Sequence, residues 1–279
     1  EKLRKKNQKN QQPANKSAIS KEINKFKIKQ NNIISKDIKL KIITSYDANF
    51  KNIGDITFKS ISQYSKKFNL KSENLKMPNT GRPQSWNKIK LLQEEIKKGE
   101  NEFIMWIDAD AFFYKDAKNI LHELDSNHEI FLVNHYCSVH KGSKFKNTIL
   151  TINRINCGMM IFKVSQFSLD FLEKVWAKDK YINHVWWEQA AIMDIIGLKA
   201  EITNNLNDNI GDDFYLKKIK FLSKEWNSIP SNNEISNESV NPSIIHLAGI
   251  NNFERIEILN EFIITKKMFN WKYFFFLNY

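Results

Sequence analysis

Two aspartates separated by a single residue, Asp108 and Asp110, are the side chains in this sequence best suited to chemistry. They follow directly on the apolar run Phe103–Ile107, whose composition is typical of a strand covered on both faces. In open α/β sheets, ligands bind beyond the carboxyl ends of the strands, and such a strand would hold both carboxylates at that edge. Oxygen ligands of this kind bind Mg²⁺ or Mn²⁺ and leave coordination positions for phosphate oxygens. The pair therefore predicts a site for Mn²⁺ (or Mg²⁺) that accepts a phosphorylated ligand.

Further polar side chains stand beside apolar stretches elsewhere in the sequence. Lys88 lies about twenty residues before the aspartate pair, Glu188 and Gln189 stand where a helix is expected to begin, and His246 ends a strand-like segment. Each also has a purely structural interpretation, as an exposed lysine, a first-turn acid stabilised by the helix dipole, and a buried histidine. Gly158 stands inside an apolar run, where a glycine indicates close approach by a ligand or by another backbone.

Other phosphate-dependent and metal-dependent classes fit less well. The chain has only 8 glycines and carries neither G-x-G-x-x-G nor G-x-x-x-x-G-K-[ST], so a glycine-rich phosphate loop is not expected. A metal-dependent phosphohydrolase remains an alternative, because phosphatases of the haloacid dehalogenase type also place D-x-D after a buried strand. Their motif continues with Thr or Val two residues later, where this chain has Phe112. Two cysteines, Cys137 and Cys157, are too few for a disulfide framework or a cysteine-based zinc site.

The elements that must position these residues can be read from apolar periodicity and turn chemistry over residues 39–265. We expect strands at 38–43, 103–107, 130–133, 157–163, 219–222 and 243–247. We expect helices at 52–70, 86–99, 116–125, 165–177 and 186–196. Strands that alternate with helices predict one α/β domain, in which helices flank a mostly parallel central sheet.

The net charge of +12 is concentrated at the beginning of the chain. Residues 1–41 carry thirteen Lys or Arg and three acids, whereas residues 42–279 carry 30 basic and 28 acidic residues, a net +2. We interpret residues 1–38 as a basic, solvated and flexible tail, or as a contact for an anionic membrane or polyanion. A non-catalytic polyanion-binding protein is therefore a second alternative, but it predicts basic residues spread over the folded part. We expect no nucleic-acid partner.

Residues 266–279 form an aromatic and basic C-terminal segment. Seven aromatic residues and three lysines allow either a packed terminal helix or peripheral contact with a membrane interface. Within the sequence shown, no apolar stretch reaches the ~18 residues of a membrane-spanning helix. Because the chain begins at Glu1, an anchor could precede it, and three locations stay open: cytoplasmic, peripheral membrane, or Golgi lumen.

Five segments, taken in order, resemble the galactosyl-, mannosyl- and xylosyltransferase family, glycosyltransferase family 34. That family's pattern is W-x-K-x-x-x-L, an apolar strand, D-x-D-A, N-x-G followed by S-L-D-F-L, [DE]-Q-x-A, and H-x-x-G. The corresponding segments begin here at Trp86, Asp108, Asn156, Glu188 and His246, and the resemblance covers about residues 40–250.

The resemblance implies a GT-A fold, a Rossmann-like nucleotide-sugar-binding domain, and a retaining transfer of a hexose or pentose. The donor would be a nucleoside diphosphate sugar, and the acceptor a hydroxyl of a glycan or glycolipid. It assigns Mn²⁺ to Asp108, Asp110 and His246, with Asp108 also touching the sugar or ribose, and the catalytic positions to Glu188 and Gln189. The donor-binding residues that it implies are Thr44, Ser45, Tyr46, Lys88, Asp108, Gly158 and Gly249.

The chain departs from this family pattern at two places. Ile250 and Asn251 follow the H-x-x-G segment, where family members often have Cys and a nearby Lys that touches the diphosphate. Lys88 or Arg255 could supply that charge instead. Glu188 stands where Asp is commoner, and retention through a covalent intermediate on Glu188 or through same-face attack stays open, although the resemblance favours same-face attack.

Overall fold

The computed structural model describes residues 38–140, 149–198, 211–230 and 237–265. The described residues of Lys39–Asn119 and those after Leu124 belong to the larger of two compact units. The sequence-predicted basic tail and aromatic C-terminal segment fall almost wholly outside the described residues. Among the described helices, none is both long enough and apolar enough to cross a membrane.

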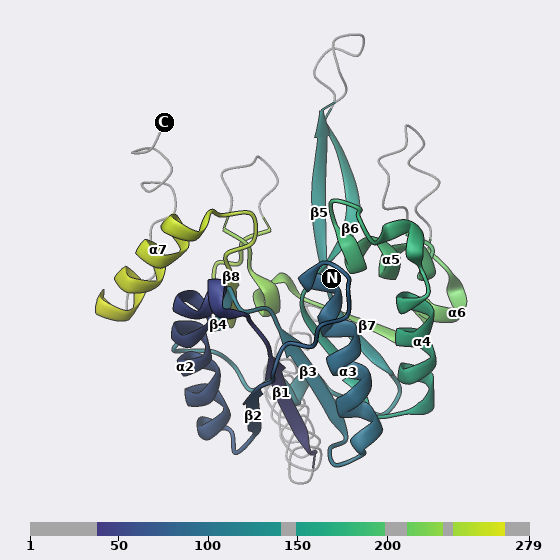
Figure 1. Ribbon diagram of the computed structural model, residues 1–279, viewed down its shortest axis with the longest axis horizontal. Coiled ribbons are helices and arrows are strands. Elements are labelled where there is room, and N and C mark those ends of the chain that lie inside the picture. The colour runs from purple at the N-terminus through teal and green to yellow at the C-terminus, as the bar shows by residue number, and fades with distance from the viewer. Residues whose placement is uncertain (1–37, 141–148, 199–210, 231–236, 266–279) are drawn as a thin grey trace, which may run out of the picture. The chain divides into compact units, whose positions relative to one another are not determined.

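The larger unit contains a six-stranded mixed sheet with the order β2-β1-β3-β6-β5-β7 (Figure 1). The pairs β1–β2, β1–β3 and β5–β7 are parallel, whereas β6 runs antiparallel to both β3 and β5. The strands are β1 (Leu40–Thr44), β2 (Lys71–Asn74), β3 (Phe103–Ile107), β5 (Ile130–His140), β6 (Ile149–Lys163) and β7 (Ile219–Leu222). The predicted α/β class with a largely parallel central sheet is confirmed.

Three helices pack side chains against this sheet: α3 (Asn87–Lys98), α4 (Gln166–Trp176) and α5 (Trp187–Ile195). Their apolar faces join buried residues of β1, β3, β5 and β6 in one large core cluster. The ends of these helices follow from local sequence. Gly99 takes the left-handed conformation (φ 66°) that suits glycine and ends α3, and the Ser165 hydroxyl accepts from the Ser168 N–H to cap α4.

A second core lies beneath α2 (Lys51–Lys67) and α7 (Asn252–Thr265). These helices pack against a two-stranded antiparallel sheet of β4 (Ala111–Phe113) and β8 (Ile244–His246). The strand predicted at 243–247 therefore exists, but it belongs to this small sheet and not to the central one. A three-residue strand such as β4 is too short to show a period in sequence.

The helix predicted over 116–125 is wrong. The only regular structure there is the short 3-10 helix η3 (Ile120–Glu123). Tertiary hydrogen bonds take the backbone groups that a helix would need: the carbonyls of Ala117 and Lys118 accept from Lys67 Nζ and Tyr64 Oη, and the Lys118 N–H donates to Ser243 Oγ.

The remaining described elements are short and lie in the connections. They are η1 (Ala48–Phe50), η2 (Gln84–Trp86), η4 (Asp179–Tyr181), α6 (Asp213–Leu216) and η6 (Lys224–Asn227).

Candidate functional site

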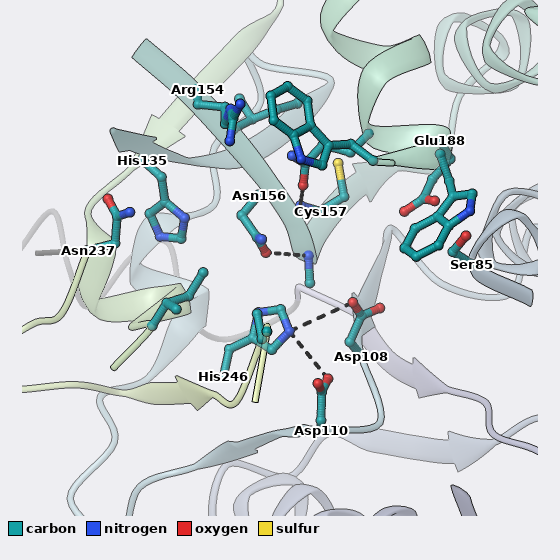
Figure 2. A pocket seen from close by; sticks show the side chains of 18 of the residues that line it. Ser85, Asp108, Asp110, His135, Arg154, Asn156, Cys157, Glu188, Asn237 and His246 are labelled. Carbon is teal, nitrogen blue, oxygen red and sulfur yellow. Dashed lines mark hydrogen bonds and ion pairs between the residues drawn. The ribbon is translucent and has the colours of Figure 1, made fainter. Parts of the chain in front are cut away.

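The central strand β3 ends at a cavity of about 680 Å³ (Figure 2). All five residues of β3 are buried, because β1 and β6 flank it in the middle of the sheet. Asp108 follows the strand, and its N–H donates to the Gly158 carbonyl at 2.8 Å. A turn closed by the Ala111 N–H on the Asp108 carbonyl (3.0 Å) then leads into β4. Both aspartates line the cavity at this edge of the sheet.

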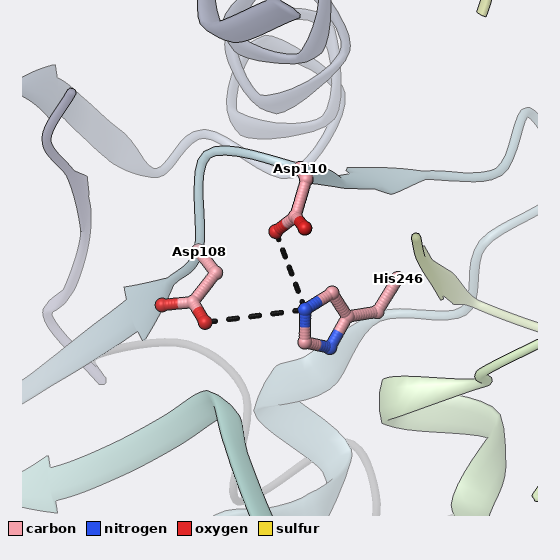
Figure 3. A group of neighbouring side chains, drawn as sticks. All are labelled: Asp108, Asp110 and His246. Atoms are coloured by element: carbon pink, nitrogen blue, oxygen red, sulfur yellow. Dashed lines mark ion pairs between the residues drawn. The ribbon is translucent and has the colours of Figure 1, made fainter. Parts of the chain in front are cut away.

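The pairing of β4 with β8 brings His246 to the aspartates. Ala111 stands opposite His246 in this small sheet, and the Leu247 N–H donates to the Asp110 carbonyl at 3.0 Å. His246 Nε2 consequently lies 3.3 Å from Asp110 Oδ1 and 3.9 Å from Asp108 Oδ2 (Figure 3). One ligand atom from each of the three residues lies within 4.8 Å of the other two. The three residues predicted as metal ligands thus form one compact group.

Each aspartate has one carboxylate oxygen held by the protein and the other turned toward His246. Asp108 Oδ1 accepts from Lys88 Nζ at 2.7 Å and from Trp106 Nε1 at 2.6 Å. Asp110 Oδ2 pairs with Arg255 Nη2 at 2.9 Å. Burial raises the pKa of Asp110, but the positive charges of a protonated His246 and of Arg255 outweigh burial and lower the pKa to about 2. Asp110 therefore stays ionised at neutral pH.

A buried amide network fixes the tautomer of neutral His246. The Gly158 backbone N–H, which can only donate, meets Asn156 Oδ1 at 2.9 Å. That oxygen therefore also accepts from Asn227 Nδ2, likewise at 2.9 Å, so Asn227 presents Oδ1 to His246 Nδ1 at 2.9 Å. The proton must lie on Nδ1, and the Nε2 lone pair faces two carboxylates. Three electron-rich atoms converge there, an arrangement that a cation stabilises.

Gly158 is the point where β6 makes room for this histidine. A Cβ atom at position 158 would lie 2.1 Å from His246 Cε1 and 2.3 Å from Nδ1. The glycine was expected to allow a ligand or a backbone to approach; within the protein, a side chain approaches. Gly158 also lines the cavity, as does Gly249, which has a left-handed φ of 77°.

Lys88 lies between Asp108 and Glu188. It is buried, and its ammonium contacts Asp108 Oδ1 (2.7 Å), Glu188 Oε1 (3.0 Å) and the Cys157 carbonyl (3.3 Å). Three N–H donors thus meet three acceptors. Burial lowers the pKa of Lys88, but the charges of Asp108 and Glu188 outweigh burial and raise the pKa above its ordinary value.

The first turn of α5 contributes Glu188 and Gln189 to the cavity lining. Glu188 is buried, and its Oε2 has no hydrogen-bond partner among the described residues. Burial raises the pKa of Glu188. The charge of Lys88 lowers this pKa and that of Asp108 raises it, and the pKa stays above its ordinary value. Gln189 Oε1 accepts from the Cys157 N–H at 3.2 Å, which leaves the amide nitrogen as the group that can donate to a ligand.

Thr44 ends β1, and Ser45 and Tyr46 follow it, at the same edge of the sheet as Asp108, because β1 and β3 are parallel. They do not line this cavity. Ser45 Oγ donates to the Leu75 carbonyl at 2.8 Å, and Tyr46 Oη donates to Asp55 Oδ1 at 2.9 Å. The role of these three residues in binding the base and ribose of the donor stays a prediction.

Several site residues were not identified from the sequence. Asn227 ends a 3-10 helix whose sequence has no period, and Asn156 was noted only as part of N-x-G. His135 of β5 also lines the cavity, and its Nε2 donates to the Asn227 carbonyl at 2.7 Å. Burial lowers the pKa of His135 to about 4. Arg255 was considered as a cation without a position, and α7 carries it to Asp110.

Comparison with known proteins identifies the family. The sequence model of the galactosyl transferase GMA12/MNN10 family matches residues 41–257. No curated protein matches the chain. Among solved structures, a glycosyltransferase involved in glycosylation of the major capsid of PBCV-1 has 14% identity and a TM-score of 0.54, over 80% of this chain and 98% of that one.

Two further glycosyltransferase structures are similar at lower TM-scores. The galactosyltransferase LgtC, in complex with donor and acceptor sugar analogs, has 12% identity and a TM-score of 0.46, over 83% of this chain and 99% of that one. GlyE of Streptococcus pneumoniae has 10% identity and a TM-score of 0.45, over 82% of this chain and 64% of that one. By the family match and the fold shared with the capsid-modifying enzyme, the chain belongs to the galactosyl transferase GMA12/MNN10 family, glycosyltransferase family 34, and is an enzyme with the GT-A fold.

Proposed function

We propose that this glycosyltransferase transfers a hexose or pentose, of the galactose, mannose or xylose class, from a nucleoside diphosphate sugar to a glycan hydroxyl, with retention at the anomeric carbon. We place the activity in residues 39–265, with Asp108, Asp110 and His246 holding Mn²⁺ (or Mg²⁺). The observation that carries the proposal is the convergence of these three side chains at the end of β3, on a cavity that Glu188 and Gln189 also line.

The donor atoms fit a divalent cation. Two carboxylates and an imidazole form a mixed oxygen and nitrogen ligand set, and Asn227 Oδ1 accepts from His246 Nδ1, which leaves Nε2 as the nitrogen that faces the carboxylates. When bound, a divalent cation supplies Lewis-acid stabilisation of the charge that develops on the leaving diphosphate.

The other residues of the cavity bind and orient the substrates. Lys88 holds Asp108 and Glu188 in place, since its three donors are all used within the protein. The Glu188 carboxylate and the Gln189 amide would face the donor sugar and the acceptor, where they can stabilise positive charge at the anomeric carbon. Arg255 is the cation beside Asp110 in this chain, which lacks the family's usual lysine.

Membership in an enzyme family sets aside the alternative of a non-catalytic polyanion-binding protein. The phosphohydrolase alternative, which already fitted poorly at Phe112, is set aside by the same match. The family implies a sugar donor and an acceptor as binding partners.

A thermal-shift screen of UDP-, GDP- and ADP-sugars tests the donor and the metal. We expect one nucleotide sugar to raise the melting temperature with Mn²⁺ present and much less with EDTA, because a ligand of the folded state stabilises it. Asp110→Ala should abolish this metal-dependent shift together with donor hydrolysis and transfer. Asp116→Ala removes an exposed carboxylate (77% exposed) outside the cavity and serves as the matched control. Wild-type turnover by the Asp110→Ala enzyme would contradict the metal assignment.

The stereochemical part of the proposal has a separate test. Proton NMR of the first product formed should show the anomeric configuration of the donor. Inversion would contradict retention while leaving the glycosyltransferase assignment intact.

A further inference from the structure

Two exposed apolar side chains border the catalytic cavity. Val185 and Trp187 are 73% and 42% exposed, and both line the cavity that contains Glu188. Large apolar side chains beside a polar cavity and open to solvent are a feature of ligand-binding surfaces. Nothing assigned above to the metal or to the donor uses them.

The backbone at Trp187 is held in an unfavourable conformation. Its φ of 41° lies in the left-handed region, which L side chains other than Asn and Asp rarely adopt. Trp186 beside it is half-buried and stacks against the Arg154 guanidinium, 3.1 Å from the ring centroid, so its position follows from packing. Packing accounts less well for the position of Trp187, because 42% of that residue is exposed. Strain of this kind concentrates at functional sites.

The residue next to Trp187 supplies a polar partner on the same cavity. Glu188 is 3% exposed, and its Oε2 has no hydrogen-bond partner among the described residues. In Figure 2 its carboxylate lies on the same side of the cavity as that of Asp108. An aromatic face beside a buried acceptor suits a ligand with a C–H face and a hydroxyl edge, which is the chemistry of a pyranose ring. A lipid chain would leave the carboxylate unsatisfied.

We propose that Val185 and Trp187 form the acceptor subsite. Trp187 stacks on the C–H face of a pyranose ring of the glycan acceptor, and a hydroxyl of that ring donates to Glu188 Oε2. This inference rests on the proposed function, because it requires a saccharide acceptor.

Two substitutions test the platform. Trp187→Gly removes the ring and also relieves the positive φ, so it should not destabilise the protein through backbone strain. Trp187→Phe keeps an aromatic face. With UDP-galactose, Mn²⁺ and lactose as probes, we expect Trp187→Gly to shift the partition of donor from transfer toward hydrolysis about tenfold and to raise the KM for lactose similarly. Trp187→Phe should restore most of the transfer. Phe221→Ala, at an exposed aromatic of β7 outside the cavity, is the control.

Acceptor binding can be followed without turnover. Saturation-transfer difference NMR with lactose and methyl α-D-mannopyranoside, in the presence of Mn²⁺ and UDP, should show the strongest transfer to ring C–H protons in wild type and its loss in Trp187→Gly. A wild-type enzyme that consumes no nucleotide sugar would overturn the proposed function. Unchanged partition in Trp187→Gly, or no saturation of either sugar in wild type, would overturn the acceptor subsite alone.

Discussion

Asn227 decides which nitrogen of His246 faces the two aspartates. It is fully buried, and its amide orientation follows from a backbone donor two hydrogen bonds away, the Gly158 N–H. Since neither the Asn156 amide nor the Asn227 amide can reverse without opposing two donors or two acceptors, the imidazole has one tautomer available in its neutral state. Asn227, which is not itself a ligand in the proposed metal site, therefore determines which nitrogen of His246 is available to bind the metal.

Replacing Asn227 should weaken metal binding more than it weakens the fold. We expect Asn227→Ala to raise the dissociation constant for Mn²⁺ about 10- to 100-fold, as for other residues that orient metal ligands, measured by isothermal titration calorimetry. Asn241→Ala, an exposed asparagine outside the cavity, is the control. Long-range ¹H–¹⁵N NMR of the metal-free protein at pH 8 should show the His246 proton on Nδ1. A proton on Nε2 with none on Nδ1 would contradict the network.

The elements of the site come from two different sheets. Asp108 follows a strand of the central sheet, whereas Asp110 precedes β4 and His246 ends β8 in the small sheet, and Gly158 of β6 lies against both Asp108 and His246. The close contact of Gly158 with the His246 ring is what lets the two sheets share one site. At this scale, a single methyl group on β6 would decide whether His246 can lie beside Asp108 and Asp110.

Gly158→Ala should separate assembly of the site from folding. The new Cβ would overlap His246, so we expect loss of Mn²⁺ binding with the β-sheet signal in circular dichroism retained. Gly99→Ala is the matched control: it makes the same chemical change at a left-handed C-cap with open space around it. It should cost about 1 kcal/mol of unfolding free energy and leave Mn²⁺ affinity unchanged. Equal Mn²⁺ affinity in Gly158→Ala and wild type would show that His246 is not a ligand.

In the molecule as a whole, the site lies where the large core under α3, α4 and α5 meets the smaller core under α2 and α7. Charged and polar groups are buried along this junction, including Lys88, Asp110, His135, Glu188 and His246. Stability should therefore depend on pH through groups that the site keeps in one protonation state.

His135 gives this dependence a direction. Its pKa falls from 6.5 to about 4 on folding, so above pH 6.5 the histidine is neutral in both states, and between 6.5 and 4 only the unfolded chain binds the proton. The free energy of unfolding should drop by about 3 kcal/mol over this window. His135→Gln, which keeps an N–H donor for the Asn227 carbonyl, should lack this contribution. Urea denaturation in EDTA at several pH values measures it, and equal slopes for the two proteins would contradict the assignment.

Local patterns in the sequence were enough for the α/β class, for strand β3 with Asp108 and Asp110 at its end, and for helices α3, α4 and α5. Each depends on neighbours a few residues away: an apolar run, a serine cap, or a glycine in the left-handed conformation. The motif order also pointed to the family that the comparison shows.

Four features of the site could not be predicted from the sequence. They are the register of β4 against β8, the space that Gly158 leaves for His246, the contact of Arg255 with Asp110, and the amide hydrogen bonds through Asn227. They join residues as much as 145 positions apart, as between Asp110 and Arg255, and no local period encodes such pairings. Hydrogen bonds from the Tyr64 and Lys67 side chains to backbone carbonyls also removed the helix expected at 116–125, since tertiary partners outcompeted the helical ones. Which atoms meet is settled by packing of the whole chain, because only the packed chain determines which buried polar groups can find partners.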